Sequence, residues 1–370
     1  MKNLSVIYLS AFVLFVLVTG MACAASTPEP TPLPPPTSTP LPAPSKTPAP
    51  TNTPALSNTP APTGFELDAN SYTHPSGAFS FNPPAGWEKS ENDFIASFVS
   101  PDGESTVLMF VTNTGIELNS DGFDTFVRAM EDNQYTFLDG FEDLGSTTLT
   151  AGQQALMEKQ YNTESGLVFG SSFYHKDGAS IFTVEMFIPV ALAEPYRESF
   201  TELLGTIGVD GSKSSNLPIY QLSWKFTGPN NSMTIEVPTG WSYSLDDQTY
   251  SDAVIETLFS PDSNGLIENI SVVSEQPYTM GNAGAIALGL LNDRYSSGGA
   301  DIRISSQKTL SDGSELWNWK STKGGYTGFT NFELRDGGKQ VLLLSFVSNN
   351  TVVDIFSPLF DRVLATYAIP

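Results

Sequence analysis

The stretches Phe79–Trp87 (FSFNPPAGW) and Met233–Trp241 (MTIEVPTGW) share one pattern, and this pattern decides how the rest of the chain is interpreted. In each stretch, every second residue is apolar, and this alternating segment is followed by Pro-x-Gly-Trp. Such alternation predicts a half-buried strand, the proline ends it, and the glycine permits the turn that follows. The tryptophan then covers an apolar edge. The same strand–turn unit is therefore predicted twice, at an offset of 154 residues.

Further matches extend this unit into a duplication of a whole domain. Three more pairs of segments lie at offsets of 159 or 160 residues: Ser100–Asp102 with Ser260–Asp262, Phe173–Gly178 with Phe332–Gly337, and Phe200–Thr206 with Phe360–Thr366. The offset is steady apart from one break after the tryptophan. We therefore expect two copies of one domain, at residues 67–210 and 219–370, joined by a short polar linker at 211–218 that allows hinge motion.

Each copy is expected to be mainly β. In the first copy, strands are predicted at residues 94–99, 107–112, 155–161, 167–174 and 180–188. An intervening helix is predicted because Phe123, Phe126, Val127 and Met130 share one helical face, with Asp121 as a plausible cap. A closing amphipathic helix ends each copy, and the Asp-Gly pairs predict hairpin turns. The predicted fold class is α+β, with two similar domains that each pack a mainly antiparallel sheet with two helices.

The early strand, the Pro-x-Gly-Trp turn, the Ser-Pro-Asp strand end and the final amphipathic helix resemble the PsbP/Mog1-like family. The resemblance covers both copies. It implies an α/β/α sandwich with a central antiparallel sheet in each. Members are mostly non-enzymatic binding or assembly factors, and several bacterial ones are lipoproteins. The tandem arrangement and the proline-rich tether depart from the family, and no functional residue is carried over.

Residues 1–25 are expected to be a signal peptide, with Lys2 as the positive region, an apolar core at Leu4–Val18 and small residues after it. Three fates are compatible with this segment. Cys23, the only cysteine of the chain, follows Gly20-Met21-Ala22 in a stretch that resembles a lipobox, which predicts lipidation of Cys23 and anchoring at the membrane. Cleavage at an Ala-x-Ala-like site would instead give a secreted protein, and an uncleaved segment would remain as a membrane helix.

Residues 26–66 are rich in proline and threonine. Proline fixes φ and removes a backbone donor, so this segment is expected to be a disordered tether without helix or sheet. In the polyproline II form it would extend by about 3.1 Å per residue. The segment is interpreted as a passive spacer or as an O-glycosylated stalk.

Composition limits the partners. The chain of 370 residues has 40 acidic and 17 basic residues and a net charge of −23. Nucleic-acid binding depends on neutralising phosphates with Lys and Arg, so DNA and RNA are not expected as partners. With one cysteine and two histidines, the folded part is expected to have no disulfide, no Cys-based zinc site and no cofactor.

No catalytic motif is present: the chain has no P-loop, no Gly-x-Ser-x-Gly and no His-Glu-x-x-His. Ser171 and Ser172 lie close to His175 in sequence, but on a strand-like run whose neighbours alternate faces. The acidic cluster of Asp139, Glu142 and Asp143 is interpreted as solvated loop charge.

Trp317 and Trp319 lie two residues apart on a predicted strand and should face the same side. They are interpreted either as core residues or as an exposed aromatic platform that binds a glycan or a peptide. They are the only candidate ligand-binding residues, and no catalytic or metal-binding residue is assigned.

The sequence therefore favours a non-catalytic, extracytoplasmic lipoprotein, anchored at the outer face of the bacterial cell membrane, that presents two related domains to an envelope partner. One alternative is a protein that binds a small molecule or a glycan in the cleft between the copies, because pockets favour domain interfaces. A hydrolase with an unrecognised carboxylate site is a further alternative. The sequence leaves the partner, the ligand, the biological process and the oligomeric state open.

Overall fold

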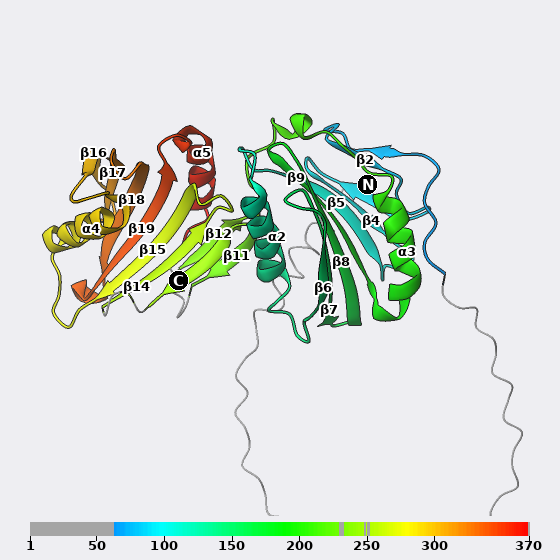
Figure 1. The fold of residues 1–370 in the computed structure, drawn as a ribbon. Coiled ribbons are helices and arrows are strands. Elements are labelled where there is room, and N and C mark those ends of the chain that lie inside the picture. Colours follow the sequence, from blue (N-terminus) through cyan, green and yellow to red (C-terminus); the bar gives the residue numbers. More distant parts are fainter. Residues whose placement is uncertain (1–62, 229–232, 248, 250–251, 369–370) are drawn as a thin grey trace, which may run out of the picture. The chain divides into compact units, whose positions relative to one another are not determined.

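The computed structural model describes residues 63–228, 233–247, 249 and 252–368 (Figure 1). The predicted signal peptide, Cys23 and the tether up to residue 62 lie outside the described residues. Within the described part, no helix has both the length and the apolar character needed to cross a membrane. Residues 62–370 form one compact unit.

Two seven-stranded antiparallel sheets form the centre of this unit, and their strands are arranged in the same order. The first sheet has the order β3-β4-β5-β9-β8-β7-β6. Its strands are β3 (Glu88–Glu91), β4 (Ile95–Val99), β5 (Thr106–Asn113), β6 (Glu142–Thr150), β7 (Gln154–Thr163), β8 (Gly166–Asp177) and β9 (Ser180–Pro189). We call the part built around this sheet the first lobe.

The second sheet has the order β13-β14-β15-β19-β18-β17-β16, which repeats the first strand for strand. Its strands are β13 (Ser242–Asp246), β14 (Ala253–Phe259), β15 (Gly265–Val273), β16 (Ile302–Thr309), β17 (Glu315–Ser321), β18 (Tyr326–Arg335) and β19 (Gln340–Asn349). The part built around it is the second lobe. The shared topology supports the predicted duplication and the predicted α+β class.

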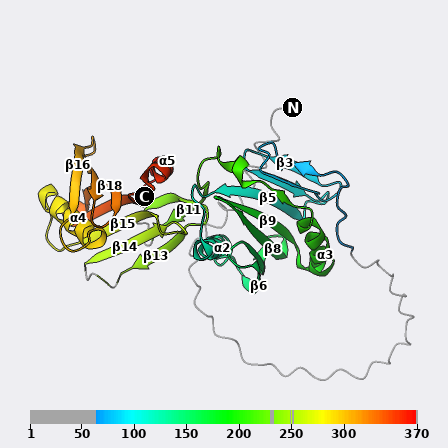
Figure 2. The ribbon, with the colours of Figure 1, turned by 45° about the horizontal axis from the view of Figure 1, so that its top comes forward.

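Two helices flank each sheet. They are α2 (Ser120–Gln134) and α3 (Ala193–Leu204) in the first lobe, and α4 (Met280–Tyr295) and α5 (Val353–Leu364) in the second. In both views β8 and β9 run between α2 and α3 (Figures 1 and 2). Because neighbouring strand residues face opposite sides, Phe173 packs in the core on the α3 side while Tyr174 packs in the core on the α2 side. The first lobe is therefore an α/β/α sandwich.

The second lobe has the same layers. Leu343 of β19 packs with Ala287 of α4, whereas its neighbour Leu344 packs in the core that contains Phe360 of α5. The short helical turns are η2 (Val190–Leu192), η3 (Gly211–Ser214) and η5 (Asp336–Gly338), and the small strands are β1 (Tyr72–Thr73), β2 (Phe79–Phe81), β10 (Gly208–Val209), β11 (Leu222–Thr227) and β12 (Thr234–Pro238). β2 and β12 are the strands that lead into the two Pro-x-Gly-Trp turns.

Two local predictions need correction. The cap of α2 is Asn119, whose side chain accepts a hydrogen bond from the Gly122 amide, while Asp121 lies in the first helical turn. The acidic residues Glu142 and Asp143 begin strand β6 instead of lying in a loop. Strand β6 has exposed residues throughout, so it lacks the apolar alternation by which the other strands were recognised.

One apolar core connects the two lobes. It combines Phe126 and Met130 of α2 with Trp241, Phe346 and Phe356 of the second lobe. The linker also contacts the first lobe: Ser214 is buried and bonded to Ser180, and the Tyr220 amide donates to Asn113 O at 2.8 Å. The linker at 211–218, which was expected to allow hinge motion, is bonded to the first lobe through Gly211, Ser214 and Leu217.

Candidate functional site

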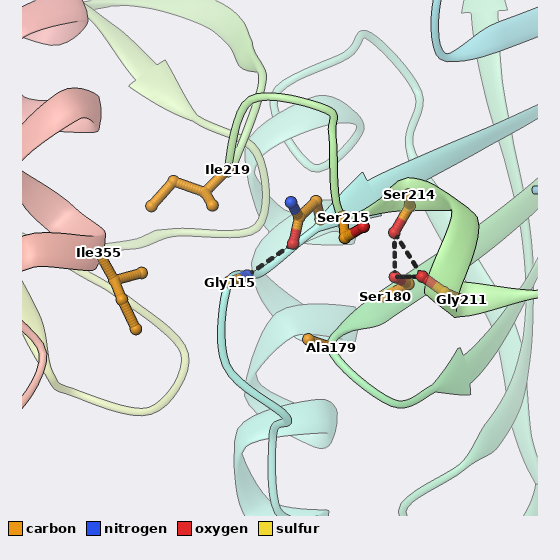
Figure 3. A pocket seen from close by; sticks show the side chains of 9 residues that line it. Gly115, Ala179, Ser180, Gly211, Ser214, Ser215, Ile219 and Ile355 are labelled. Carbon is orange, nitrogen blue, oxygen red and sulfur yellow. Dashed lines mark hydrogen bonds between the residues drawn. The ribbon is translucent and has the colours of Figure 1, made fainter. Parts of the chain in front are cut away.

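A pocket of about 310 Å³ lies where the linker passes between the lobes (Figure 3). Its first-lobe side is formed by the β5 end and the β8–β9 turn, and its second-lobe side by Ile219 and Ile355. The lining residues are Asn113, Gly115, Ala179, Ser180, Gly211, Ser214, Ser215, Ile219 and Ile355. This pocket lies in the region where a cleft between the copies was expected.

The lining of this interlobe pocket is uncharged and combines polar groups with apolar ones. Ser180 and Ser214 are hydrogen-bonded to each other, and Asn113 Oδ1 accepts from the Gly115 amide at 2.9 Å. The two isoleucines supply an apolar wall opposite these groups, as Figure 3 shows. Such a lining offers hydroxyl and amide groups to a neutral polar ligand, and none of its side chains can exchange a proton near neutral pH.

A second candidate is a cluster of charged groups buried beneath α2. Its centre is Lys159 of β7, which is 1% exposed. The Lys159 Nζ donates to both carboxylate oxygens of Glu131, at 2.8 and 2.7 Å, and to Ser172 Oγ at 2.7 Å. It also lies 3.8 Å from the centre of the Tyr135 ring, within cation–π range. All three ammonium hydrogens thus have protein acceptors.

A second carboxylate, Glu185 of β9, extends this buried cluster. Tyr135 OH donates to Glu185 Oε1 at 2.7 Å, and Ser172 Oγ donates to the same oxygen at 3.1 Å. Tyr174 OH donates to Glu131 at 2.9 Å. One lysine and two glutamates are therefore held together by hydroxyl groups inside the lobe.

Burial shifts the protonation of these groups. It raises the pKa of Glu185, and the nearby Lys159 opposes this shift only in part. Burial also raises the pKa of the Tyr135 hydroxyl well above its usual value, and the charge of Glu185 adds to this effect. Burial therefore makes the charged forms of Tyr135 and Glu185 less favourable than they are in water.

The same position in the second lobe contains a different buried network. In the first lobe Lys159 lies opposite Gly170, and in the second lobe Trp319 lies opposite Gly328. A Cβ atom on Gly328 would meet the Trp319 ring at 2.6 Å, so this glycine leaves space for the indole. The pair Ser172–Glu185 likewise corresponds to the pair Thr330–Ser345. The segments containing Phe173 and Phe332 therefore align at an offset of 158 residues in the structure, one fewer than the sequence match, and these two phenylalanines face opposite sides of their sheets. The two lobes therefore hold a buried ammonium group and a buried indole at equivalent positions.

The second network nevertheless keeps a carboxylate and a tyrosine. Trp319 Nε1 donates to Thr330 Oγ1 at 2.9 Å, and Thr330 is bonded to Ser345 at 2.8 Å. Glu268, beside Ser345 on β15, accepts hydrogen bonds from Tyr295 and Arg294. Tyr295 ends α4 as Tyr135 follows α2. Both lobes therefore bury a glutamate beneath the last turn of the equivalent helix.

A smaller pocket of about 150 Å³ opens beside the Lys159 cluster. Glu131 and Lys159 lie at this pocket, with Asp132, Asp143 and Glu158 around it. The three donors of Lys159 are already used within the protein, so the pocket reaches a charge pair that is internally satisfied. Among the residues that the structure describes, no group of three or more His, Asp or Glu side chains is placed to hold a metal ion.

The candidate residues Trp317 and Trp319 are buried, so they do not form an exposed platform. Trp317 packs edge-on against Phe332 at 4.7 Å between ring centres, and Trp319 is 1% exposed and packs beside Tyr295. The expectation that they share one face is correct, but that face is the one covered by α4. Of the two interpretations left open by the sequence, the structure supports the core.

The remaining sequence candidates also have structural partners. Ser172 bonds to Lys159 and Glu185, while the His175 ring lies 3.5 Å from the Gln154 side chain. Among the acidic residues, Asp139 accepts from Asn162 at 2.9 Å and Glu142 accepts from Gln160 at 2.6 Å. These bonds tie the acidic cluster to β7.

The sequence interpretation missed the Lys159 cluster. A signal was present, because Ala155, Met157, Lys159 and Tyr161 occupy alternate positions of one strand, so a lysine stands in phase with apolar neighbours. Its partners Glu131 and Glu185 lie on other elements, and only the fold brings them to it.

Comparisons with known proteins concern the fold. No protein-family model and no curated protein matches this chain. Among solved structures, the Ran-binding protein Mog1p of Saccharomyces cerevisiae is similar, with 13% identity and a TM-score of 0.32 over 40% of this chain and 99% of Mog1p. Cyanobacterial PsbP from Synechocystis shows 12% identity and a TM-score of 0.31 over 38% of this chain and 92% of its own.

A third similar structure extends over both lobes. It is the immunity protein TplEi of a T6SS from Pseudomonas aeruginosa, with 9% identity and a TM-score of 0.22 over 77% of this chain and 97% of that chain. The PsbP/Mog1-like resemblance expected from the sequence is thus found again among solved structures. At these identities and scores the likeness carries no function to this chain.

Proposed function

We propose that this protein is a non-catalytic binding or assembly module of the bacterial envelope, anchored through Cys23, that presents two PsbP/Mog1-like lobes to a protein partner. The observation that carries the proposal is how the reactive groups are placed. The buried groups Lys159, Glu131, Glu185 and Tyr135 of the first lobe are bonded within one cluster beneath α2, while the interlobe pocket is lined without a titratable side chain. This distribution supports a binding role, because the donors and acceptors of the buried cluster are occupied by one another.

The shared core between the lobes supports the same proposal. Trp241 and Phe356 of the second lobe pack with Phe126 of the first, so the two sheets are joined by apolar contacts as well as by the linker. A partner would therefore meet one continuous two-lobed surface, which lowers the entropy lost on binding.

The experiment that tests this function is cross-linking in intact producing cells with the full chain as bait, followed by mass spectrometry of the captured proteins. One envelope protein captured in near-equal amount would support the proposal. Failure to capture any protein, with a bait shown to be folded and exported, would contradict it. Metabolic labelling with palmitate tests the anchor separately: label that persists in a Cys23→Ala variant would contradict lipidation at this residue.

The interlobe pocket favours a second candidate function, the binding of a small neutral polar molecule or a glycan fragment. Its volume of about 310 Å³ lies at the lower limit for ligand pockets. Saturation-transfer NMR with neutral mono- and disaccharides would test this function. Binding that is lost in Ser215→Trp, which fills the pocket from its exposed rim, would support it; equal signals in both proteins would contradict it.

A further inference from the structure

Within the part of the chain that the structure describes, the two longest outer strands of the sheets pair with another strand on one side only. β6 ends the first sheet with nine residues, all exposed, and β16 ends the second sheet with eight residues, seven of them exposed. The opposite edges are shorter, because β3 has four residues and β13 has five. An open edge presents unpaired backbone donors and acceptors, and another strand can add to it.

The two open edges have opposite charges. β6 contains Glu142 and Asp143 and no basic residue, whereas β16 contains Arg303 and Lys308 and no acidic residue. Lys320 of β17 lies directly opposite Arg303 and adds to the basic edge. Two carboxylates near this edge are bonded within the lobe: Asp301 accepts from Ser321 at 2.8 Å, and Glu315 accepts from Thr309 at 2.7 Å. Beside β6, Lys159 is buried and paired with Glu131, so it does not neutralise the acidic edge.

Apolar side chains accompany both edges. Leu144 and Leu149 of β6 and Ile304 of β16 are exposed, as is Phe137 just before β6, at 63%. Both strands also contain bulges, after Asp143 and Thr148 in β6 and after Ile304 in β16. In β6 the four residues between the two bulges, Gly145–Thr148, pair in regular register. In β16 the four residues after the bulge, Ser306–Thr309, do the same. Each edge therefore has a short regular segment with charged and apolar neighbours.

We propose that the acidic edge β6 of one copy pairs with the basic edge β16 of a second copy of this chain. In an antiparallel pairing the acidic start of β6 lies beside Lys308, and in a parallel pairing it lies beside Arg303, so attraction results in either direction. Pairing of like edges is disfavoured, since two antiparallel β16 strands bring Arg303 opposite Lys308. Each chain has one acidic edge and one basic edge. A second copy is therefore expected to bind head to tail, with its β16 against the β6 of the first copy.

The contact is heterologous because β6 and β16 belong to different lobes of the chain. Each added copy leaves one acidic and one basic edge free, so the assembly grows as a chain unless it closes into a ring. The attraction between exposed charges is screened by salt, so the assembly is expected to weaken as ionic strength rises. This inference does not depend on the proposed envelope partner or on the lipid anchor.

Two tagged forms of the full chain test the pairing. Both have Cys23→Ser, and one has Thr147→Cys in β6 while the other has Ser306→Cys in β16. A short bis-maleimide should cross-link the mixture into heterodimers, and a chain with both introduced cysteines should give a ladder. Each single-cysteine form alone should cross-link several-fold less. Equal yields in the single forms, or no cross-link in a mixture whose circular dichroism shows folded protein, would overturn the proposal.

Charge reversal provides the specific control. Arg303→Glu with Lys308→Glu in the Ser306→Cys form should lower the cross-linked yield several-fold. Glu142→Lys with Asp143→Lys in the Thr147→Cys form should restore it when the two reversed forms are mixed. A yield that does not respond to these reversals would also overturn the proposal. Capture of an envelope protein without any self-cross-linking would overturn this inference alone and leave the proposed function standing.

Discussion

Phe126 of the first lobe occupies the space that a Cβ atom on Gly240 of the second lobe would need. Gly240 belongs to the second Pro-x-Gly-Trp turn and has a φ of 75°. Gly86 holds the equivalent place in the first turn, with the same φ of 75°, but a Cβ atom there would meet nothing within 4 Å. The repeated turn therefore faces solvent in one lobe and the interlobe core in the other.

This pair of glycines gives a matched test of the interlobe core. Gly240→Ala should lower the free energy of unfolding by about 2–5 kcal/mol, because backbone strain at positive φ adds to overpacking against Phe126. Gly86→Ala has the same backbone strain alone and should cost about 1–2 kcal/mol. Denaturant unfolding of both variants measures the difference. Equal losses would show that Phe126 and Gly240 are not packed together in solution.

The buried ion pair should be worth far more than an exposed one. Glu131→Gln leaves the ammonium of Lys159 without its carboxylate in a buried site, and the free energy of unfolding should fall by about 3–5 kcal/mol. The control is Glu333→Gln, which removes the partner of the partly exposed Arg335 and should cost about 1 kcal/mol or less. Similar losses in both variants would contradict the burial of Lys159.

The pH dependence of stability should depend on Glu185. Its folded pKa is raised by burial, so the folded state favours the protonated form, and the resulting stability is present below the ordinary pKa of 4.5 and is lost as pH rises through the folded pKa. In that window the free energy of unfolding should fall with pH by at most about 1.4 kcal/mol per unit.

The groups that face Glu185 are Lys159, Glu131, Ser172 and Tyr135, and Leu108 lies beside it on β5. Glu185→Gln keeps an acceptor for Tyr135 and removes the titration, so its stability curve should be flatter than that of the wild type as pH rises above 4.5. Glu104→Gln, at an exposed turn, should leave the wild-type slope unchanged. A Glu185→Gln curve that is parallel to the wild-type curve would contradict the assignment.

The buried tryptophans can be tested by fluorescence. Trp317 and Trp319 lie inside the second lobe, so acrylamide should quench their emission poorly. Replacing both by Phe removes protected emission, and the Stern–Volmer constant of the remaining signal should rise. A fall in this constant would mean that the two rings are accessible, as the aromatic platform would require.

Local sequence patterns were sufficient for much of the fold. Strands 155–161 and 180–188 were expected and are found as β7 (154–163) and β9 (180–189), because side-chain alternation reports which face of a strand is covered. The Asp177-Gly178 pair does connect β8 to β9, and Gly178 has a φ of 59° that glycine adopts readily. These features depend on neighbours in sequence and are therefore visible before folding.

Strand β6 and the Lys159 cluster were not visible in this way. β6 is exposed on both faces, so no alternation marks it, and it pairs with β7 through backbone bonds and polar side-chain contacts such as Gln160 to Glu142. The cluster unites α2, β7, β8 and β9, whose residues are brought together by strand order and register.

By itself, the sequence determined that one strand–turn–helix unit occurs twice, since periodicity and turn residues act over short distances along the chain. Only the tertiary structure decided that Trp241 is enclosed by both lobes while Trp87 remains partly exposed, and that the site of Lys159 in one lobe is the site of Trp319 in the other. The reason is that burial and charge pairing depend on which strands become neighbours, and a sequence pattern does not specify which neighbour a side chain will meet.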